Sequence, residues 1–248
     1  MFKTKNFRED LDILLNKIKD ENIAFSRFGD GEMAIIKKQT IDLLDKNTGE
    51  FRFSPDEKKY NIPYQLLAKS FTTNIENYYI SISCPCCVGQ TKHLEMLKAS
   101  GLDRQKITWA NLFVNSNYYY FMTNISKFLK DKEVYLISNK NSKIDRMPFN
   151  IRKHYVVGAD SWLNDLGLID EIKSDINKNN IRNSYFLFCA GPLSNIACCE
   201  LFEYNNNNTY LDCGSVFDVL LGLGKTRGYL RGEKTLQKTC IWSYNEDT

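Results

Sequence analysis

Histidine is scarce in this sequence, and its scarcity limits the catalytic chemistry open to the chain. Only two of the 248 residues are histidines, His93 and His154. No G-x-S-x-G motif is present, the turn in which many serine hydrolases place their nucleophile. A Cys/His dyad built from Cys84 or Cys86 with His93 lacks any flanking motif that would support it. Nucleophilic catalysis by a serine or cysteine is therefore disfavoured.

Long apolar runs are also missing. None reaches the ~18 residues that a membrane-spanning helix requires. The N-terminal stretch 1–20 carries charges throughout and has no apolar core, so it does not resemble a secretory signal. We expect a cytoplasmic protein that is not integral to the membrane. Peripheral membrane contact and self-association remain open.

The charges are nearly balanced, which argues against nucleic acid as the main partner. The formal net charge is only +3, and the 25% of charged residues is ordinary for a soluble globular protein. The basic stretch "GKTRGYLRGEK" at 224–234 is the best candidate for binding a phosphorylated ligand, although a solvated basic surface is the more ordinary explanation. The length suits one large α/β domain or two small ones, and we interpret residues 1–248 as a single domain.

Eight cysteines are present, and three of them lie together in "SCPCC" as Cys84, Cys86 and Cys87. Without a targeting segment, a disulfide framework is disfavoured. A zinc site that also uses His93 is a weaker alternative, because the spacing is not that of paired C-x-x-C motifs. The preferred interpretation is a set of reduced, half-buried thiols at a turn between a strand and a helix.

Short apolar runs alternate with longer helical patterns along most of the chain. Strands are predicted at 22–28, 77–83, 107–114, 133–138, 154–158, 184–190 and 209–214. Helices are predicted at 7–20, 31–38, 56–73, 89–100, 115–130, 161–178, 191–203 and 215–222. Most strands are continuously apolar, which is typical of a parallel sheet covered on both faces. The sequence therefore predicts an α/β fold with a Rossmann-like, doubly wound and mostly parallel sheet. The polar segment 39–56 is an excursion from this pattern or a mobile lid.

Ligands of such sheets bind outside the carboxyl ends of the strands, which directs attention to the stretch "RFGDGE" at 27–32. Asp30 and Glu32 follow a strand directly, and in an extended segment their side chains would point the same way. Gly29 and Gly31 would let a phosphate or an ion approach the backbone, and Arg27 could pair with a phosphate. Two converging carboxylates would suit Mg²⁺ or Mn²⁺. The equally weighted alternative is an acidic helix N-terminus with no ligand.

Three other strand ends carry candidate residues. At 189–195, Pro192 begins a helix, and Gly191, Ser194 and the free backbone N–H groups there could bind an anion, although no P-loop or G-x-G-x-x-G motif is present. Ser215 and Asp218 could cap the next helix, or Asp218 could be a third acid in a cleft. Asn115 and Asn117 stand beside a row of tyrosines, a composition that suits a hydroxyl-rich or base-like ligand as well as ordinary capping.

The stretch "FSRFGDGE" resembles the opening motif of the GT-D fold glycosyltransferases. The match consists of Arg27, Gly29, Asp30, Gly31 and Glu32, and the stretches "FVNSNYYYF", "AGPLSN" and "DCGSVFD" are similar to later blocks in the same order. The resemblance runs from about residue 21 to about residue 225. It implies a Rossmann-like fold and a glycosyltransferase that acts on a glycan, glycolipid or glycoprotein acceptor.

The same resemblance implies a nucleotide-sugar donor, with a UDP-sugar favoured, and Mn²⁺ or Mg²⁺ held with the diphosphate by Asp30 and Glu32. On this hypothesis Arg27 and the helix start at Gly191–Ser194 would bind phosphate, and Asn115 and Asn117 would contact the sugar or base. Asp160 and Asp218 are candidate bases for an inverting reaction. Two alternatives are a Mg²⁺-dependent phosphohydrolase or phosphotransferase, and a non-catalytic nucleotide- or glycan-binding module.

Overall fold

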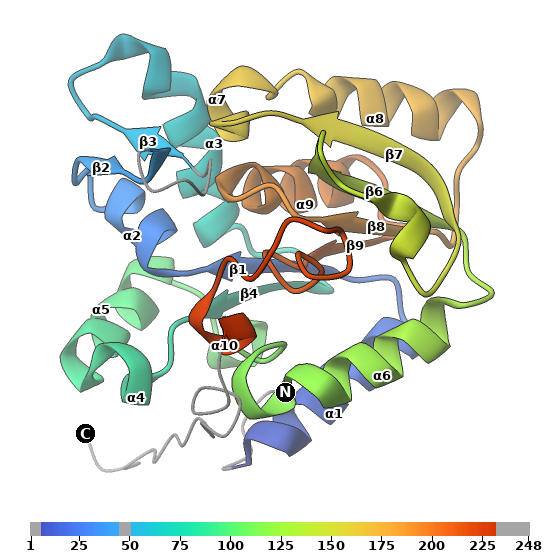
Figure 1. Cartoon of the computed structure of the whole chain (residues 1–248). Helices are drawn as coiled ribbons and strands as arrows, with labels where there is room; N and C mark the ends of the chain where they lie inside the picture. The colour runs from blue at the N-terminus through green and yellow to red at the C-terminus, as the bar shows by residue number, and fades with distance from the viewer. Residues whose placement is uncertain (1–5, 45–50, 232–248) are drawn as a thin grey trace.

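A seven-stranded parallel sheet forms the centre of the protein, in the strand order β5-β4-β1-β9-β8-β6-β7 (Figure 1). The computed structural model describes residues 6–44 and 51–231. The strands are β1 (Ala24–Phe28), β4 (Tyr78–Ile82), β5 (Ile107–Trp109), β6 (Val134–Asn139), β7 (Ile151–Val157), β8 (Tyr185–Phe188) and β9 (Thr209–Asp212). Every neighbouring pair in this sheet is parallel, so the predicted α/β, Rossmann-like fold is confirmed.

Helices cover both faces of the sheet, as the continuously apolar strands predict. Figure 1 shows α1 and α6 together on one side, with α3, α9 and α8 on the other. Alternate residues of β1 supply the two faces, since Phe25 packs in the cluster with α1 and α6 while Ala24 and Phe28 pack with α3 and α9. The α-helices are α1 (Phe7–Asp20), α2 (Asp30–Ile36), α3 (Asn61–Thr72), α4 (Pro85–Val88), α5 (Gln90–Ser100), α6 (Tyr118–Leu129), α7 (Ser161–Asn164), α8 (Leu168–Lys178), α9 (Pro192–Tyr204) and α10 (Gly228–Arg231). No helix in the described ranges is both long and apolar enough to cross a bilayer.

The excursion at 39–56 contributes a short antiparallel pair, β2 (Ile41–Asp42) and β3 (Arg52–Phe53). Aromatic rings attach it to the rest of the protein: Phe53 and Tyr60 both pack on Trp162 of α7, with ring centroids 6.0 and 5.6 Å from it. The pair thereby holds Phe51, which is only 5% exposed, above the carboxyl edge of the sheet. The described part of the predicted excursion is therefore packed against α7 and reaches the cavity at the carboxyl edge of the sheet.

Three predicted elements are wrong in detail. Residues 215–222 form consecutive turns instead of a helix, because Gly214 and Gly222 adopt positive φ angles of 52° and 70° and i→i−3 hydrogen bonds dominate between them. The predicted helix 161–178 is two helices, α7 and α8, separated near Gly167. The predicted strand 107–114 ends at Trp109. Within residues 51–231, 3₁₀ turns also lie at Lys58–Tyr60, Arg104–Lys106, Asn115–Asn117 and Ile144–Arg146.

Candidate functional site

A cavity of about 500 Å³ opens at the carboxyl edge of the sheet. Its walls come from the segments that follow β1, β5, β6, β7, β8 and β9, the position at which α/β sheets bind ligands. Six of the residues predicted from the sequence line it: Arg27, Gly29, Glu32, Gly191, Ser215 and Asp218. Other lining residues include Phe51, Asn139, Asn141, Asp212, Gly214 and Arg227. Three carboxylates and two guanidinium groups therefore face one cavity.

Glu32 reaches the cavity from the first turn of α2. Gly29 is the N-cap of this helix, and its backbone N–H donates a 3.0 Å hydrogen bond to Glu32 Oε2. Burial raises the pKa of Glu32, and the backbone hydrogen bonds and the charges of Arg27 and Arg227 oppose that rise. The carboxylate thus caps a helix and lines the cavity at the same time.

Asp30 lies apart from Glu32, contrary to the expectation that the two side chains point the same way. The chain becomes helical at Asp30, and residues two apart on a helix do not share a face. Asp30 is exposed, and Ser83 Oγ donates a 3.4 Å hydrogen bond to its Oδ1. Asp30 is not among the described residues that line the cavity. The assumption of an extended segment was wrong, because the helix begins at the first acid.

Asp212 is an acid of the cavity that the sequence analysis missed. It ends β9 beside β1, where Arg27 N–H donates to its Oδ2 at 2.9 Å and Gly214 N–H donates to its Oδ1 at 3.0 Å. Burial raises the pKa of Asp212 to about 7; Arg27 opposes this, and the charge of Glu32 adds to it. The signal in the sequence was a single acid that closes an apolar strand in "TYLDCG".

Arg27 provides a fixed positive charge beneath the cavity. Its Nε donates to Ala110 O at 2.7 Å, and its Nη1 donates to Cys213 O at 3.0 Å. Gly214 lies directly on the guanidinium, because a Cβ at this position would be 2.5 Å from Nη1. A rigid guanidinium held by backbone carbonyls is preorganised to face an anion.

The chain after β9 lines part of the cavity and adds polar groups to it. Thr226 Oγ1 donates a hydrogen bond to Asp218 Oδ2, and the Ser215 and Tyr229 hydroxyls are 2.9 Å apart. Arg227, from the basic stretch noted in the sequence, lines the cavity. This segment therefore brings Asp218 and a second arginine to the site without forming the predicted helix.

Several predicted site residues have structural contacts elsewhere. Asn117 donates to Phe7 O and accepts from Arg8 Nε, both at 2.9 Å, which joins the 3₁₀ turn at 115–117 to α1. Asp160 accepts from Trp162 Nε1 at 3.0 Å and from the backbone N–H of Arg52 at 3.3 Å, which fastens β3 to α7. Ser194 accepts from the backbone N–H of Ala190 at 3.0 Å. Among the residues described, the cavity lining does not include these three or Asn115, Pro192 and Gly31.

Gly31 has a packing role instead, because Phe51 lies on it. A Cβ at Gly31 would be 2.6 Å from Cζ of the Phe51 ring, which also lies near Gly191. We expect Gly31→Ala to displace Phe51 and to lower the free energy of unfolding by about 1–3 kcal/mol, as overpacking does. Gly167→Ala is the matched control, since a Cβ there meets nothing within 4 Å. Equal urea midpoints for the two variants would contradict the prediction.

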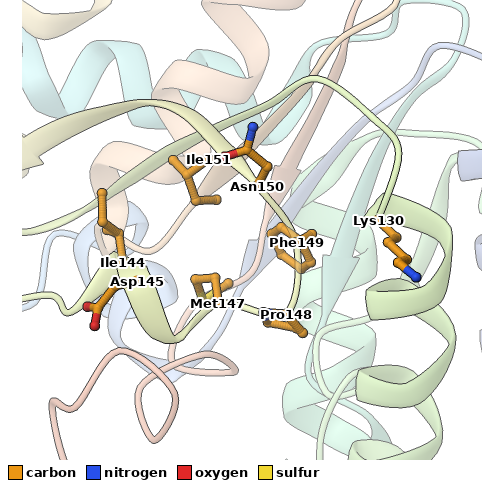
Figure 2. A pocket seen from close by; sticks show the side chains of 8 residues that line it. All are labelled: Lys130, Ile144, Asp145, Met147, Pro148, Phe149, Asn150 and Ile151. Carbon is orange, nitrogen blue, oxygen red and sulfur yellow. The ribbon is translucent and has the colours of Figure 1, made fainter.

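A hollow of about 570 Å³ lies elsewhere, between the connection from β6 to β7 and the end of α6 (Figure 2). Its charged lining groups are Lys130 and Asp145, and most of its other walls are apolar, among them Met147 and Phe149. Figure 2 shows these side chains spread around the rim instead of converging. The smaller cavity at the carboxyl edge is therefore the better candidate for chemistry.

Comparison with solved structures places this fold among known ones. A new glycosyltransferase (DUF1792) from Streptococcus sanguinis aligns with a TM-score of 0.57 and 16% sequence identity over 85% of this chain and 80% of its own. A second structure is described as showing that domain of unknown function 1792 has a distinct glycosyltransferase fold. It aligns with a TM-score of 0.56 and 16% sequence identity, over 83% of this chain and 77% of its own. A selenomethionine-substituted DUF1792 structure aligns with a TM-score of 0.52 and 14% sequence identity, over 83% of this chain and 82% of its own.

The sequence itself matches no family model and no curated protein. At such low identity, the structural likeness establishes the fold and nothing finer. The chain therefore has the glycosyltransferase fold described for DUF1792, as the resemblance of its "FSRFGDGE" stretch implied.

Proposed function

We propose that this protein is a glycosyltransferase that moves a sugar from a nucleotide-sugar donor to a hydroxyl of a glycan, glycolipid or glycoprotein. The observation that carries the proposal is the cavity at the carboxyl edge of the sheet, where Glu32, Asp212 and Asp218 face Arg27 and Arg227 on a fold shared with a glycosyltransferase. A diphosphate leaving group needs its growing negative charge stabilised, and fixed cations at a water-poor site do this well.

A divalent metal fits the carboxylates of this cavity. Glu32 and Asp212 are close enough for the charge of Glu32 to raise the pKa of Asp212, so a cation between them would relieve their repulsion. An oxygen-only set of ligands suits Mg²⁺ or Mn²⁺. When bound, the metal would act as a Lewis acid on the diphosphate. We propose Glu32 and Asp212 as the residues that hold it, and we keep Asp30 as a candidate on the family resemblance alone.

The remaining groups suggest how the chain would orient a donor. Arg27 and Arg227 would bind phosphate oxygens, and the backbone N–H groups at the start of the 13-residue helix α9, beside Gly191, would add a favourable dipole. Asn139 and Asn141, after β6, offer donors and acceptors for sugar hydroxyls in place of the predicted Asn115 and Asn117.

For an inverting reaction, Asp218 is the better candidate base. It lines the cavity, whereas Asp160 accepts hydrogen bonds from Arg52 and Trp162 away from it. A base must come within hydrogen-bond reach of the proton that it removes, so position decides between the two acids.

A donor screen tests the proposal. UDP-, GDP-, CMP- and dTDP-sugars are added with and without Mn²⁺, and the shift in Tm and the release of nucleotide are recorded. We expect one donor, with a UDP-sugar favoured, to raise Tm and to release its nucleoside diphosphate only when metal is present. Phosphate release from simple phosphoesters would favour a phosphohydrolase, and a Tm shift without turnover over hours would favour a binding module; either result overturns the proposal.

A further inference from the structure

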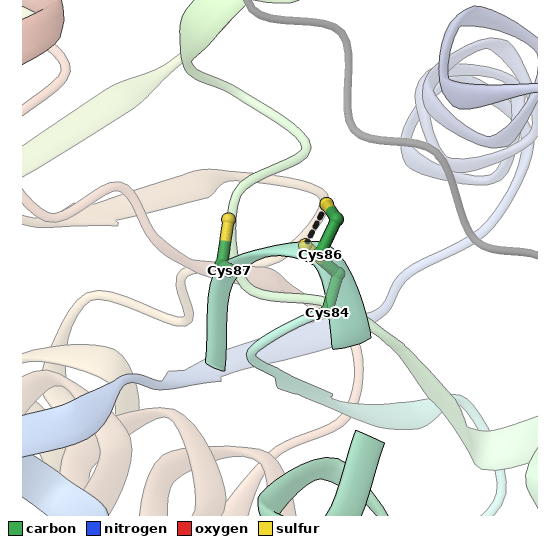
Figure 3. A group of neighbouring side chains, drawn as sticks. All are labelled: Cys84, Cys86 and Cys87. Carbon is green, nitrogen blue, oxygen red and sulfur yellow. Dashed lines mark hydrogen bonds between the residues drawn. The ribbon is translucent and has the colours of Figure 1, made fainter. Parts of the chain in front are cut away.

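Three cysteine side chains lie together after the carboxyl end of β4 (Figure 3), and none of them lines the cavity of the candidate active site. The Sγ atoms of Cys84, Cys86 and Cys87 all lie within 4.8 Å of one another, and those of Cys84 and Cys86 are 3.1 Å apart. Cys84 is buried, whereas Cys86 and Cys87 are exposed. The group is thus anchored in the protein on one side and open to solvent on the other.

The local sequence explains why the thiols meet. Cys84 is the N-cap of the short helix α4, and Pro85 fixes the first turn. The backbone N–H of Cys87 donates to Cys84 O at 3.0 Å, which closes the turn. Gly89, with a φ angle of 85°, ends it. This tight turn therefore brings the three sulfurs within 4.8 Å of one another.

The spacing suits a thiophilic metal ion. With a Zn–S bond of about 2.3 Å, tetrahedral geometry places thiolate sulfurs about 3.8 Å apart. The Cys84 and Cys86 sulfurs are closer than this, at 3.1 Å, and all three sulfurs lie within 4.8 Å of one another, so side-chain rotations would bring them to this spacing. Three thiolates form a soft ligand set that selects zinc over Mg²⁺ or Mn²⁺.

Asn111 supplies the outer contacts that such a site requires. Its side-chain Nδ2 donates toward Cys84 Sγ at 3.5 Å and toward Cys87 Sγ at 3.8 Å. N–H donors that point at sulfur favour the thiolate form and orient the ligands. The amide comes from the segment after β5, so it links two neighbouring strand ends at the cluster.

We propose that Cys84, Cys86 and Cys87 bind one zinc ion, with water in the fourth position and Asn111 as the positioning residue. Each thiol that binds loses its proton to solvent, and no oxidant or reductant is needed. The site differs from the four-ligand version weighed from the sequence, because His93 Nδ1 is 2.9 Å from Ser83 O and His93 lies outside the thiol group.

Zinc at this turn would act on the neighbouring helix start. Ser83 directly precedes the cluster and donates its hydroxyl hydrogen bond to Asp30, the first residue of α2. A metal that fixes the turn would therefore also restrain the segment that carries Glu32. We expect zinc to raise Tm as a ligand of the folded state does.

The test uses the full-length, reduced, metal-free protein titrated with Co²⁺ and then with Zn²⁺. We expect a sulfur-to-cobalt charge-transfer band that saturates at one equivalent and that zinc displaces. In the double variant Cys86→Ser/Cys87→Ser the band should disappear and affinity should fall by more than about 100-fold, and Asn111→Ala should weaken binding by about tenfold. Cys189→Ser removes a thiol outside the cluster and should leave the band unchanged.

Alkylation gives a second measurement that does not depend on how the variants fold. Cys86 and Cys87 are exposed, so iodoacetamide should modify both in the metal-free wild-type protein, and zinc should protect both. Absence of a thiolate band, a band that survives in the double variant, or unprotected cysteines at saturating zinc would each overturn the proposal.

Discussion

Glu32→Gln is expected to reduce the rate of sugar transfer by about 10³-fold, the loss typical when a main electrostatic group is removed from a preorganised site. The change keeps the shape of the side chain and leaves a side-chain oxygen that can accept the capping hydrogen bond from Gly29 N–H. It removes the negative charge that faces the cavity beside Asp212. A loss of this size would therefore report the charge and not the helix cap.

Asp30→Asn is the matched comparison, since it makes the same chemical change two residues away. Asp30 is exposed and accepts from Ser83 outside the cavity, so we expect a loss of about tenfold or less from the weaker helix-dipole term. Transfer rates over a range of Mn²⁺ concentrations separate the two roles. If Asp30→Asn lost as much activity as Glu32→Gln, Asp30 would also act at the metal, as the family resemblance implies. If neither variant changed the dependence on metal, the assignment of Glu32 would be wrong.

The sequence predicted the sheet well because its signals are local. Continuously apolar runs such as 184–190, which are short and rich in aromatic residues, favour buried strands, and helix 7–20 has both a clear apolar face and the Asn6 cap. The rule that ligands bind at the carboxyl ends of strands then located the cavity correctly.

The details of the site were harder to predict, because they depend on contacts between distant segments. Asn117 is 110 positions from Phe7, and only the packed structure shows that its side-chain amide donates a hydrogen bond to that carbonyl. Asp212 gained its importance from lying beside β1, a pairing that no local pattern encodes. The direction of the Asp30 side chain was wrongly predicted for a different reason, since a shift of one residue in the start of a helix decides which way that side chain points.

Asp212→Asn should remove a pH dependence from the stability of the metal-free protein. Burial raises the pKa of Asp212 in the folded state to about 7 from an ordinary 3.8, so the folded protein holds this proton more tightly than the unfolded chain. The contribution of this proton to the free energy of unfolding is fully present below about pH 4 and is lost as the pH rises toward 7. The expected fall in the free energy of unfolding is at most about 4 kcal/mol across that range.

The slope with pH, and not the absolute stability, tests this prediction. Asparagine cannot accept both backbone hydrogen bonds from Arg27 and Gly214, so the variant loses about 1–3 kcal/mol at every pH. Urea unfolding between pH 4 and 8 should show a flatter profile for Asp212→Asn than for wild type, while the exposed-surface control Asp170→Asn should keep the wild-type slope. A wild-type slope in Asp212→Asn would show that Asp212 does not hold the proton.

The effect of Mn²⁺ on stability tests whether Asp212 also has the metal-binding role proposed for it. A cation held by Glu32 and Asp212 would favour the ionised carboxylates, so saturating Mn²⁺ should stabilise wild type more at pH 7 than at pH 5. Asp212→Asn should lose most of this Mn²⁺-dependent stabilisation at pH 7, because one of the two carboxylates proposed to hold the metal is gone. If Mn²⁺ stabilised both proteins equally at both pH values, the metal would bind elsewhere. Glu32 and Asp212 would then be two neighbouring acids that repel each other and bind no metal.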